Sequence, residues 1–201
     1  MIKNCPRTPI GVLSDPLNAS FAWSKGLGAE ASVERAAQFA DRACKLGIKK
    51  TCLAVAGAWN QGVGRPADPT AVADALRRAC DLRVGEACRR LANAYLDGNG
   101  VKQDLAKSSE LSLLACMFDD GIGCHNYATE FYSRPRNDAN LTLAREYYDK
   151  GCKAGFGDSC FNVAVMAEKG EGGPADTARS GDYLKRGCEL GHAECCKHAP
   201  K

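Results

Sequence analysis

The sequence predicts an all-α protein, a right-handed α/α solenoid of about five helical hairpins with 36 residues each. Three observations predict this fold. Ten of the twelve cysteines recur at a constant interval of 36 residues, and periods of about 20 to 50 residues are typical of repeat architectures. Apolar and small residues keep the i, i+3, i+4 spacing of one helical face. Glycines recur in the turns that separate the expected helices.

The domain boundaries follow from this repeat. Residues 1–15 contain prolines and show no periodicity, so we expect an extended N-terminal arm. Residues 16–201 are expected to form a single solenoid. Its first unit, residues 17–43, lies in register with the later units but lacks a cysteine pair. Terminal repeats that cap a solenoid are often atypical in this way.

The first helix of each unit is expected to carry three columns that together form one packed face. An apolar column contains Ala19, Val55, Leu91, Tyr127 and Val163. A small column beside it contains Ser20, Ala56, Ala92, Ala128 and Ala164. A mostly aromatic column contains Trp23, Trp59, Tyr95, Phe131 and Ala167. The small column allows two helices to approach closely, and the aromatic column fills the space beyond it.

The second helix of each unit is expected to begin after a glycine turn and to end at the first cysteine of a pair. Its expected N-caps are Asp68, Asp104, Asn140 and Asp176. On its polar face we expect the ion pairs Asp74–Arg78, Glu146–Lys150 and Asp182–Arg186. One unit has Arg134–Pro135–Arg136 in place of the glycine turn, which predicts either a partner contact or a tolerated loop variant.

The cysteine pairs are expected to be structural disulfides that join one hairpin to the next. The pairs are Cys44–Cys52, Cys80–Cys88, Cys116–Cys124, Cys152–Cys160 and Cys188–Cys196. A structural zinc site is the first alternative, but it needs four ligands at shorter cysteine spacing, and the chain has three histidines. The crowded tail from Cys188 to His198 is where a metal site would lie. Redox catalysis is the second alternative, without the Cys-x2-Cys motif that usually indicates it.

We therefore expect neither a metal nor a cofactor. Cys5 and Cys195 lie outside the series and are expected to be unpaired, or to form a bond with a second chain.

Composition narrows the class of partner and compartment. The net charge of +3 lacks the concentrated basicity of a nucleic-acid-binding protein. We expect no membrane span, because no apolar stretch approaches the required length. Twelve cysteines in 201 residues indicate an oxidising compartment. The N-terminus lacks a secretory signal, so we expect the mitochondrial intermembrane space if Met1 is the authentic start, and otherwise the periplasm or secretion.

One unit carries a family motif. It reads Leu91-Ala92-x-x-Tyr95-x-x-Gly98-x-Gly100-Val101, followed by Asp104. This motif resembles the Sel-1-like repeat, a helical hairpin of the tetratricopeptide type. The Cys-x7-Cys spacing resembles its cysteine-rich branch, which includes the Helicobacter cysteine-rich proteins and a mitochondrial intermembrane-space assembly factor for cytochrome c oxidase. The resemblance covers about residues 16–198 and implies a disulfide-bridged solenoid.

The expected function is that of a non-catalytic scaffold, an assembly factor or adaptor that binds a protein or peptide on the concave surface formed by the first helices. The expected binding residues are Arg90, Asn93, Asn126, Thr129, Glu130 and Asn162. The resemblance implies one alternative, weak β-lactam binding or hydrolysis. The sequence lacks the Ser-x-x-Lys motif of serine β-lactamases, so we assign no catalytic residue.

Overall fold

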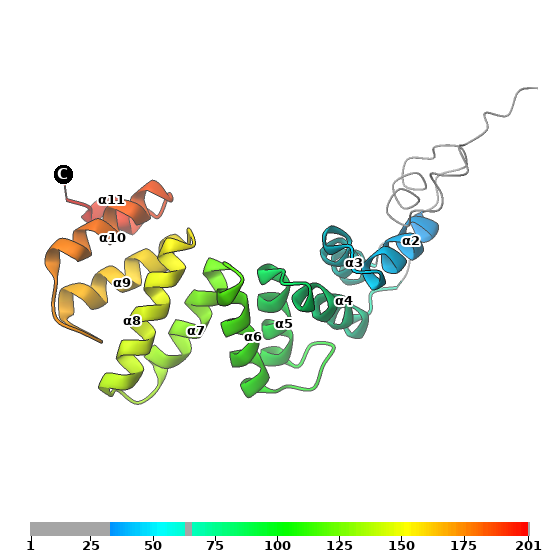
Figure 1. Cartoon of the computed structure of the whole chain (residues 1–201), viewed down its shortest axis with the longest axis horizontal. Coiled ribbons are helices and arrows are strands. Elements are labelled where there is room, and N and C mark those ends of the chain that lie inside the picture. Colours follow the sequence, from blue (N-terminus) through cyan, green and yellow to red (C-terminus); the bar gives the residue numbers. More distant parts are fainter. Residues whose placement is uncertain (1–32, 63–65, 201) are drawn as a thin grey trace, which may run out of the picture.

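A computed structural model describes residues 33–62 and 66–200, and the part it describes is entirely α-helical. Figure 1 shows the helices packed in sequential pairs along one elongated array, with α2 and α11 at opposite ends. This arrangement confirms the predicted all-α repeat solenoid. The predicted arm, residues 1–15, lies outside the described residues. The helices are α2 (Val33–Lys45), α3 (Lys49–Gln61), α4 (Pro69–Asp81), α5 (Gly85–Asp97), α6 (Leu105–Met117), α7 (Gly121–Ser133), α8 (Asp138–Lys153), α9 (Gly157–Lys169), α10 (Thr177–Glu189) and α11 (Ala193–His198).

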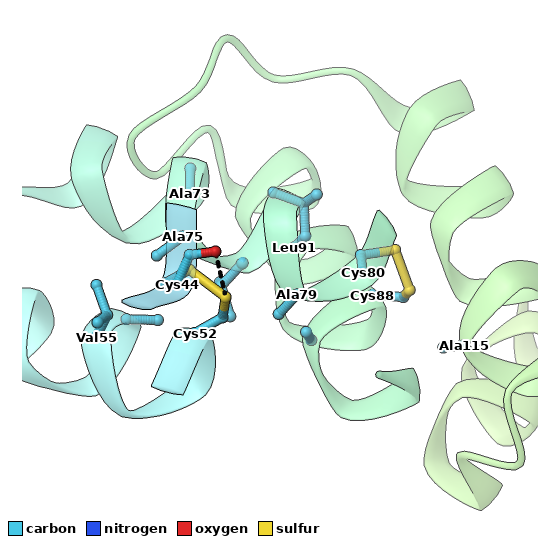
Figure 2. Packing of buried hydrophobic residues seen from close by; sticks show 13 residues of the cluster. Cys44, Cys52, Val55, Ala73, Ala75, Ala79, Cys80, Cys88, Leu91 and Ala115 are labelled. Atoms are coloured by element: carbon cyan, nitrogen blue, oxygen red, sulfur yellow. Dashed lines mark hydrogen bonds between the residues drawn. A yellow bond between two sulfur atoms is a disulfide. The ribbon is translucent and has the colours of Figure 1, made fainter. Parts of the chain in front are cut away.

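The predicted columns of the first helices form the core. Val55, Leu91 and Val163 are at most 4% exposed. The alanines of the small column, at positions 56, 92, 128 and 164, are at most 1% exposed. Figure 2 shows Val55 and Leu91 among the buried residues of one core cluster, which also contains Ala73, Ala75, Ala79 and Ala115. Each repeat therefore buries its apolar face on its neighbours, as expected for a solenoid.

Five disulfides join each second helix to the first helix of the next repeat, and their pairing is the predicted one. The Cα–Cα distances lie between 4.4 and 4.7 Å, within the range that a disulfide requires. Figure 2 shows two of these bonds, Cys44–Cys52 and Cys80–Cys88, bridging successive hairpins. So many structural disulfides persist only where thiols are oxidised, which indicates an oxidising compartment.

The residues that immediately precede the two cysteines of a bridge pack against each other. A Cβ atom added to Gly187 would lie 2.3 Å from the sulfur of Cys195, and one added to Gly151 would lie 2.4 Å from the hydroxyl of Ser159. In these two bridges the larger member of the pair therefore lies opposite a glycine. Cys195 is free, as expected, but it is fully buried, so its thiol is not accessible to a second chain. Cys5 lies outside the described residues.

The helix ends follow the predicted turn chemistry in three of four repeats. Asp68, Asp104 and Asp176 each accept a backbone N–H of the helix they open, which confirms them as N-caps. The predicted N-cap at Asn140 is wrong. Asn137 caps α8 instead and accepts the backbone N–H of Asn140 at 2.8 Å. Without the glycine turn of the other repeats, the chain turns within fewer residues and α8 begins earlier.

The Arg134–Pro135–Arg136 turn is held by contacts within the chain. The residue before a proline disfavours helical backbone, and Arg134 is accordingly extended at the end of α7. Its guanidinium pairs with Glu130. The Arg136 guanidinium pairs with Glu171 at 2.6 Å. Both arginines therefore have internal ion pairs, which favours the loop-variant interpretation over a partner contact.

The polar faces of the second helices pair differently from the prediction. The Glu146–Lys150 pair is present at 2.7 Å, but Asp74 pairs with Arg77 at 2.6 Å and not with Arg78. Arg186 does not pair with Asp182. It donates to the carbonyl oxygens of Cys152 and Lys153 at 3.0 and 2.9 Å. These carbonyls end α8, so Arg186 satisfies acceptors that the helix leaves open.

Arg83 gives a first testable prediction, because it adopts left-handed backbone with a φ of 61°. Glycine occupies the equivalent positions 47, 155 and 191. We expect Arg83→Gly to raise the free energy of unfolding by up to about 1 kcal/mol, since left-handed backbone costs other residues roughly 1–2 kcal/mol. Urea unfolding measures the change. Arg83→Ala is the control, because it retains the backbone strain and removes the guanidinium, which lies 5.7 Å from the Phe118 ring centroid. A glycine variant less stable than the alanine variant would contradict the prediction.

Candidate partner-binding groove

A groove of about 700 Å³ lies between the first helices α5 and α7 and the second helix α6. Its wall is rich in hydroxyl, amide and carboxylate groups, together with two leucines and one histidine. The lining residues are Asn93, Leu96, Asp97, Leu105, Ser108, Ser109, Ser112, His125, Asn126, Thr129, Glu130 and Ser133. Such a groove is of the size that small ligands or side chains of a partner occupy.

Ser112 explains why the groove is large in this repeat. The equivalent residues of the other repeats are Ala40, Leu76, Tyr148 and Leu184. A large side chain at this position takes up space between successive hairpins, as Leu76 and Tyr148 do in their buried positions. Ser112 is itself 6% exposed and leaves more of that space empty. The small residue therefore enlarges the hollow.

Four of the six predicted binding residues line this groove: Asn93, Asn126, Thr129 and Glu130. The other two lie outside its wall. Arg90 pairs with Glu86 of its own helix at 3.7 Å, and Asn162 lies on α9, the first helix of the next repeat. The hollow therefore lies between α5 and α7, on the helix face that carries the predicted binding residues, whose role in binding stays a prediction.

A buried polar network supports the α7 side of the groove. The Thr129 hydroxyl hydrogen-bonds the Tyr148 hydroxyl at 2.9 Å, and Tyr148 is 3% exposed. The Nδ1 atom of His125 lies 3.1 Å from the hydroxyl of the buried Ser159. Burial lowers the pKa of His125, because the charged imidazole loses solvent, and it raises the pKa of Tyr148 for the same reason. His125 is therefore favoured as a neutral hydrogen-bonding group.

The α5 side is fixed by an ion pair between neighbouring repeats. Arg89 donates through Nε to both carboxylate oxygens of Asp120 at 3.1 and 3.2 Å. Asp120 also accepts the backbone N–H of Gly123 at 2.7 Å and caps α7. Both side chains are less than 20% exposed. The pair therefore sets the position of α7 relative to α5, and with it the width of the groove.

Sequence reasoning missed eight lining residues: Leu96, Asp97, Leu105, Ser108, Ser109, Ser112, His125 and Ser133. The signal that points to the groove is the exchange of a large residue for Ser112 when the repeats are aligned. Asp97 also departs from its column, and nothing comparable distinguishes the other six. The prediction followed two columns of the first helices, whereas the wall also includes the second helix between them.

A second hollow of about 390 Å³ occupies the equivalent place two repeats further on, between α9 and α10. Its wall includes Phe161, Val165 and Leu184, and His198 and Pro200 border it. Leu184 is the counterpart of Ser112, and its larger side chain goes with a smaller hollow.

Two features are absent from the described part of the chain. No helix there is long and apolar enough to cross a membrane. No group of three or more histidine, cysteine, aspartate or glutamate residues within it is placed to hold a metal ion.

The repeats match a known family. The Sel1 repeat model matches residues 21–48, 85–117, 112–156 and 157–192, which is more than half of the chain. No curated protein matches the chain in sequence.

Solved structures show the same fold. A Sel1 repeat protein from Oxalobacter formigenes is 19% identical with a TM-score of 0.71, and the alignment covers 94% of this chain and 77% of that one. The protective antigen c5321 of uropathogenic Escherichia coli is 17% identical with a TM-score of 0.76, covering 92% and 40%. The immunity protein Pa5087 from Pseudomonas aeruginosa is 14% identical with a TM-score of 0.51, covering 98% and 75%. From its repeats and their stacking, the chain belongs to the Sel1 repeat family.

Proposed function

We propose that the protein is a scaffold that binds an extended segment of a partner protein in the groove between α5, α6 and α7. The observation that supports this proposal is the polar hollow that Ser112 enlarges. Asn93 and Asn126 line it, and neither side-chain amide has a hydrogen-bond partner among the described residues. An amide both donates and accepts, so each can bind one peptide group of an extended backbone. Arg90 and Asn162 are proposed as outer contacts, because they share the helical column of Asn126.

Closing the groove should abolish binding without unfolding the protein. We expect Ser112→Leu, which copies Leu76 and Leu184, to retain the wild-type melting temperature, because leucine fits this position in two other repeats. Partner capture is measured with a photoreactive phenylalanine analogue at Asn93. The same analogue at Lys185, an exposed residue of α10, is the control for non-specific labelling. We expect adducts from position 93 that Ser112→Leu removes.

Two results would contradict this function. One is labelling from position 93 that persists in Ser112→Leu. The other is retention of every partner by the Arg90→Ala and Asn126→Ala variants. That result would show that the guanidinium and amide of this column do not contact the partner.

The compartment and the alternative activity are tested with the same protein. We propose that the partner is met in the mitochondrial intermembrane space, the periplasm or outside the cell, and fractionation of the endogenous protein distinguishes these. Weak β-lactam binding or hydrolysis remains the alternative prediction. Clear nitrocefin turnover by the purified protein would favour it over the scaffold function.

A further inference from the structure

The groove is flanked by two acidic residues that the other repeats lack. Asp97 and Glu130 both line it. At the position of Asp97 the other repeats have Lys25, Gln61, Ser133 and Lys169. At the position of Glu130 they have Ala22, Ala58, Ala94 and Met166. The acids are therefore not part of the repeat pattern, and they lie on α5 and α7, the first helices of the two successive repeats between which Ser112 lies.

Both acids lie in the last turn of a helix, where the helix dipole disfavours them. The carboxyl end of a helix carries partial negative charge, and a basic residue there is favourable. In α9, Lys169 meets this preference, whereas the last turns of α5 and α7 contain no base. Asp97 has no ion pair within the described parts of the chain, and Glu130 pairs with Arg134. The end of α5 and the unpaired Asp97 carboxylate therefore contribute negative charge to the rim.

The floor of the groove offers further oxygen acceptors. Ser112 lines the hollow beside Ser108 and Ser109. Its hydroxyl is not among the buried polar atoms that lack a partner in the described part of the chain, so it faces the open space of the groove. A ligand that donates hydrogen bonds can use it as an acceptor.

The mouth of the groove presents apolar surface next to these acids. Leu96 and Leu105 line it and are 46% and 63% exposed. The side chains of lysine and arginine combine an aliphatic stem, which covers apolar surface, with a cationic group that carries only hydrogen-bond donors. A neutral apolar side chain would match only the apolar surface, and an acidic side chain would match neither the apolar surface nor the carboxylates.

We infer that the groove selects a lysine or arginine side chain of the partner segment. The inference rests on the peptide-binding function proposed above. The aliphatic stem lies along Leu96 and Leu105, the cation pairs with Asp97 at the rim with support from Glu130, and the serine hydroxyls accept its remaining donors. Asp97 is the specificity-determining residue, because its carboxylate has no ion-pair partner within the described residues.

The test uses an array of nine-residue labelled peptides with flexible neutral flanks and Lys, Arg, Met or Glu at the centre. Binding of the full-length protein is measured by fluorescence anisotropy at low salt. We expect the Lys and Arg peptides to bind at least about tenfold more tightly than the Met peptide, and the preference to fall at high salt. The difference between Lys and Arg then identifies the cation.

Three variants separate the cation preference from peptide binding itself. Asp97→Lys copies Lys169 of the equivalent position and is expected to reverse the preference toward the Glu peptide. Asp182→Asn removes an exposed acid of α10 outside the groove and should change nothing. Ser112→Leu should weaken binding of every peptide.

The outcomes are distinguishable. Equal binding of Lys, Arg and Met peptides, all weakened by Ser112→Leu, overturns the cation inference and leaves the proposed function intact. Peptide binding that is unaffected by Ser112→Leu overturns the groove as the binding site. Retention of the Lys or Arg preference by Asp97→Lys overturns the role of Asp97, and an array in which no peptide binds overturns both proposals.

Discussion

Reduction of the five disulfides is expected to unfold the chain at room temperature. Each bond closes a loop between residues eight apart in sequence, for which the chain-entropy model gives roughly 2.5 kcal/mol. Five bonds in successive repeats contribute independently to a first approximation, since a solenoid's stability is a sum over neighbours. Their combined contribution of roughly 12 kcal/mol approaches the whole stability of an ordinary domain, about 5–15 kcal/mol.

The experiment compares the same protein refolded from urea with and without a thiol reductant. Reduction in urea is needed because eight of the ten bridged cysteines are buried in the native state. Far-ultraviolet circular dichroism measures helix content after dilution of the urea. The oxidised sample should recover its helical signal, and the reduced sample should not. A reduced chain that melts cooperatively at the oxidised protein's temperature would show that packing alone maintains the fold.

Single bridges should differ by their place in the array. Cys116–Cys124 joins α6 to α7 in the middle of the chain, whereas Cys188–Cys196 joins α10 to the terminal α11. Alanine replacement of the central pair is expected to lower the cooperativity of the whole transition. Replacement of the terminal pair should release α11 alone. Hydrogen exchange resolved by helix distinguishes these two responses.

The fold and the pairing could be predicted because they repeat. An interval of 36 residues repeated through ten cysteines leaves one register, and that register also fixes the buried columns that include Leu91 and Ala92. The N-cap at Asn140 could not be placed correctly by the same reasoning. The competing acceptor, Asn137, belongs to the one repeat without a glycine turn, where the register no longer determines the local backbone.

The groove was only partly predictable for a related reason. A column such as Arg90, Asn126 and Asn162 indicates which face of the first helices is free of packing. It does not indicate where that face is hollow, which depends on the volume of Ser112 in the neighbouring second helix. Departures from the repeat are therefore more informative about function than the repeat itself, and Ser112, Asp97 and Glu130 are three such departures within one groove.

Gly187→Ala is expected to destabilise the chain strongly. The new Cβ would lie 2.3 Å from the sulfur and 2.9 Å from the Cβ of Cys195, and 3.1 Å from the Cβ of Cys160. Cys195 is fully buried and its neighbour Cys196 is held by a disulfide, so the sulfur cannot move aside cheaply. We expect a loss of about 3 kcal/mol, at the upper end of overpacking substitutions. Urea unfolding and hydrogen exchange in α10 and α11 measure it.

The second half of the prediction is a rescue. Another repeat has Ala79 and Ala87 at the same two positions, both fully buried, so this contact accommodates two alanines. Adding Cys195→Ala to Gly187→Ala is therefore expected to recover most of the lost stability, although Cys195→Ala alone removes a buried sulfur and should cost about 1 kcal/mol. Gly57→Ala is the matched control, since a Cβ there meets no atom within 4 Å. If the double variant is no more stable than Gly187→Ala, the glycine is required by the backbone and not by the thiol opposite it.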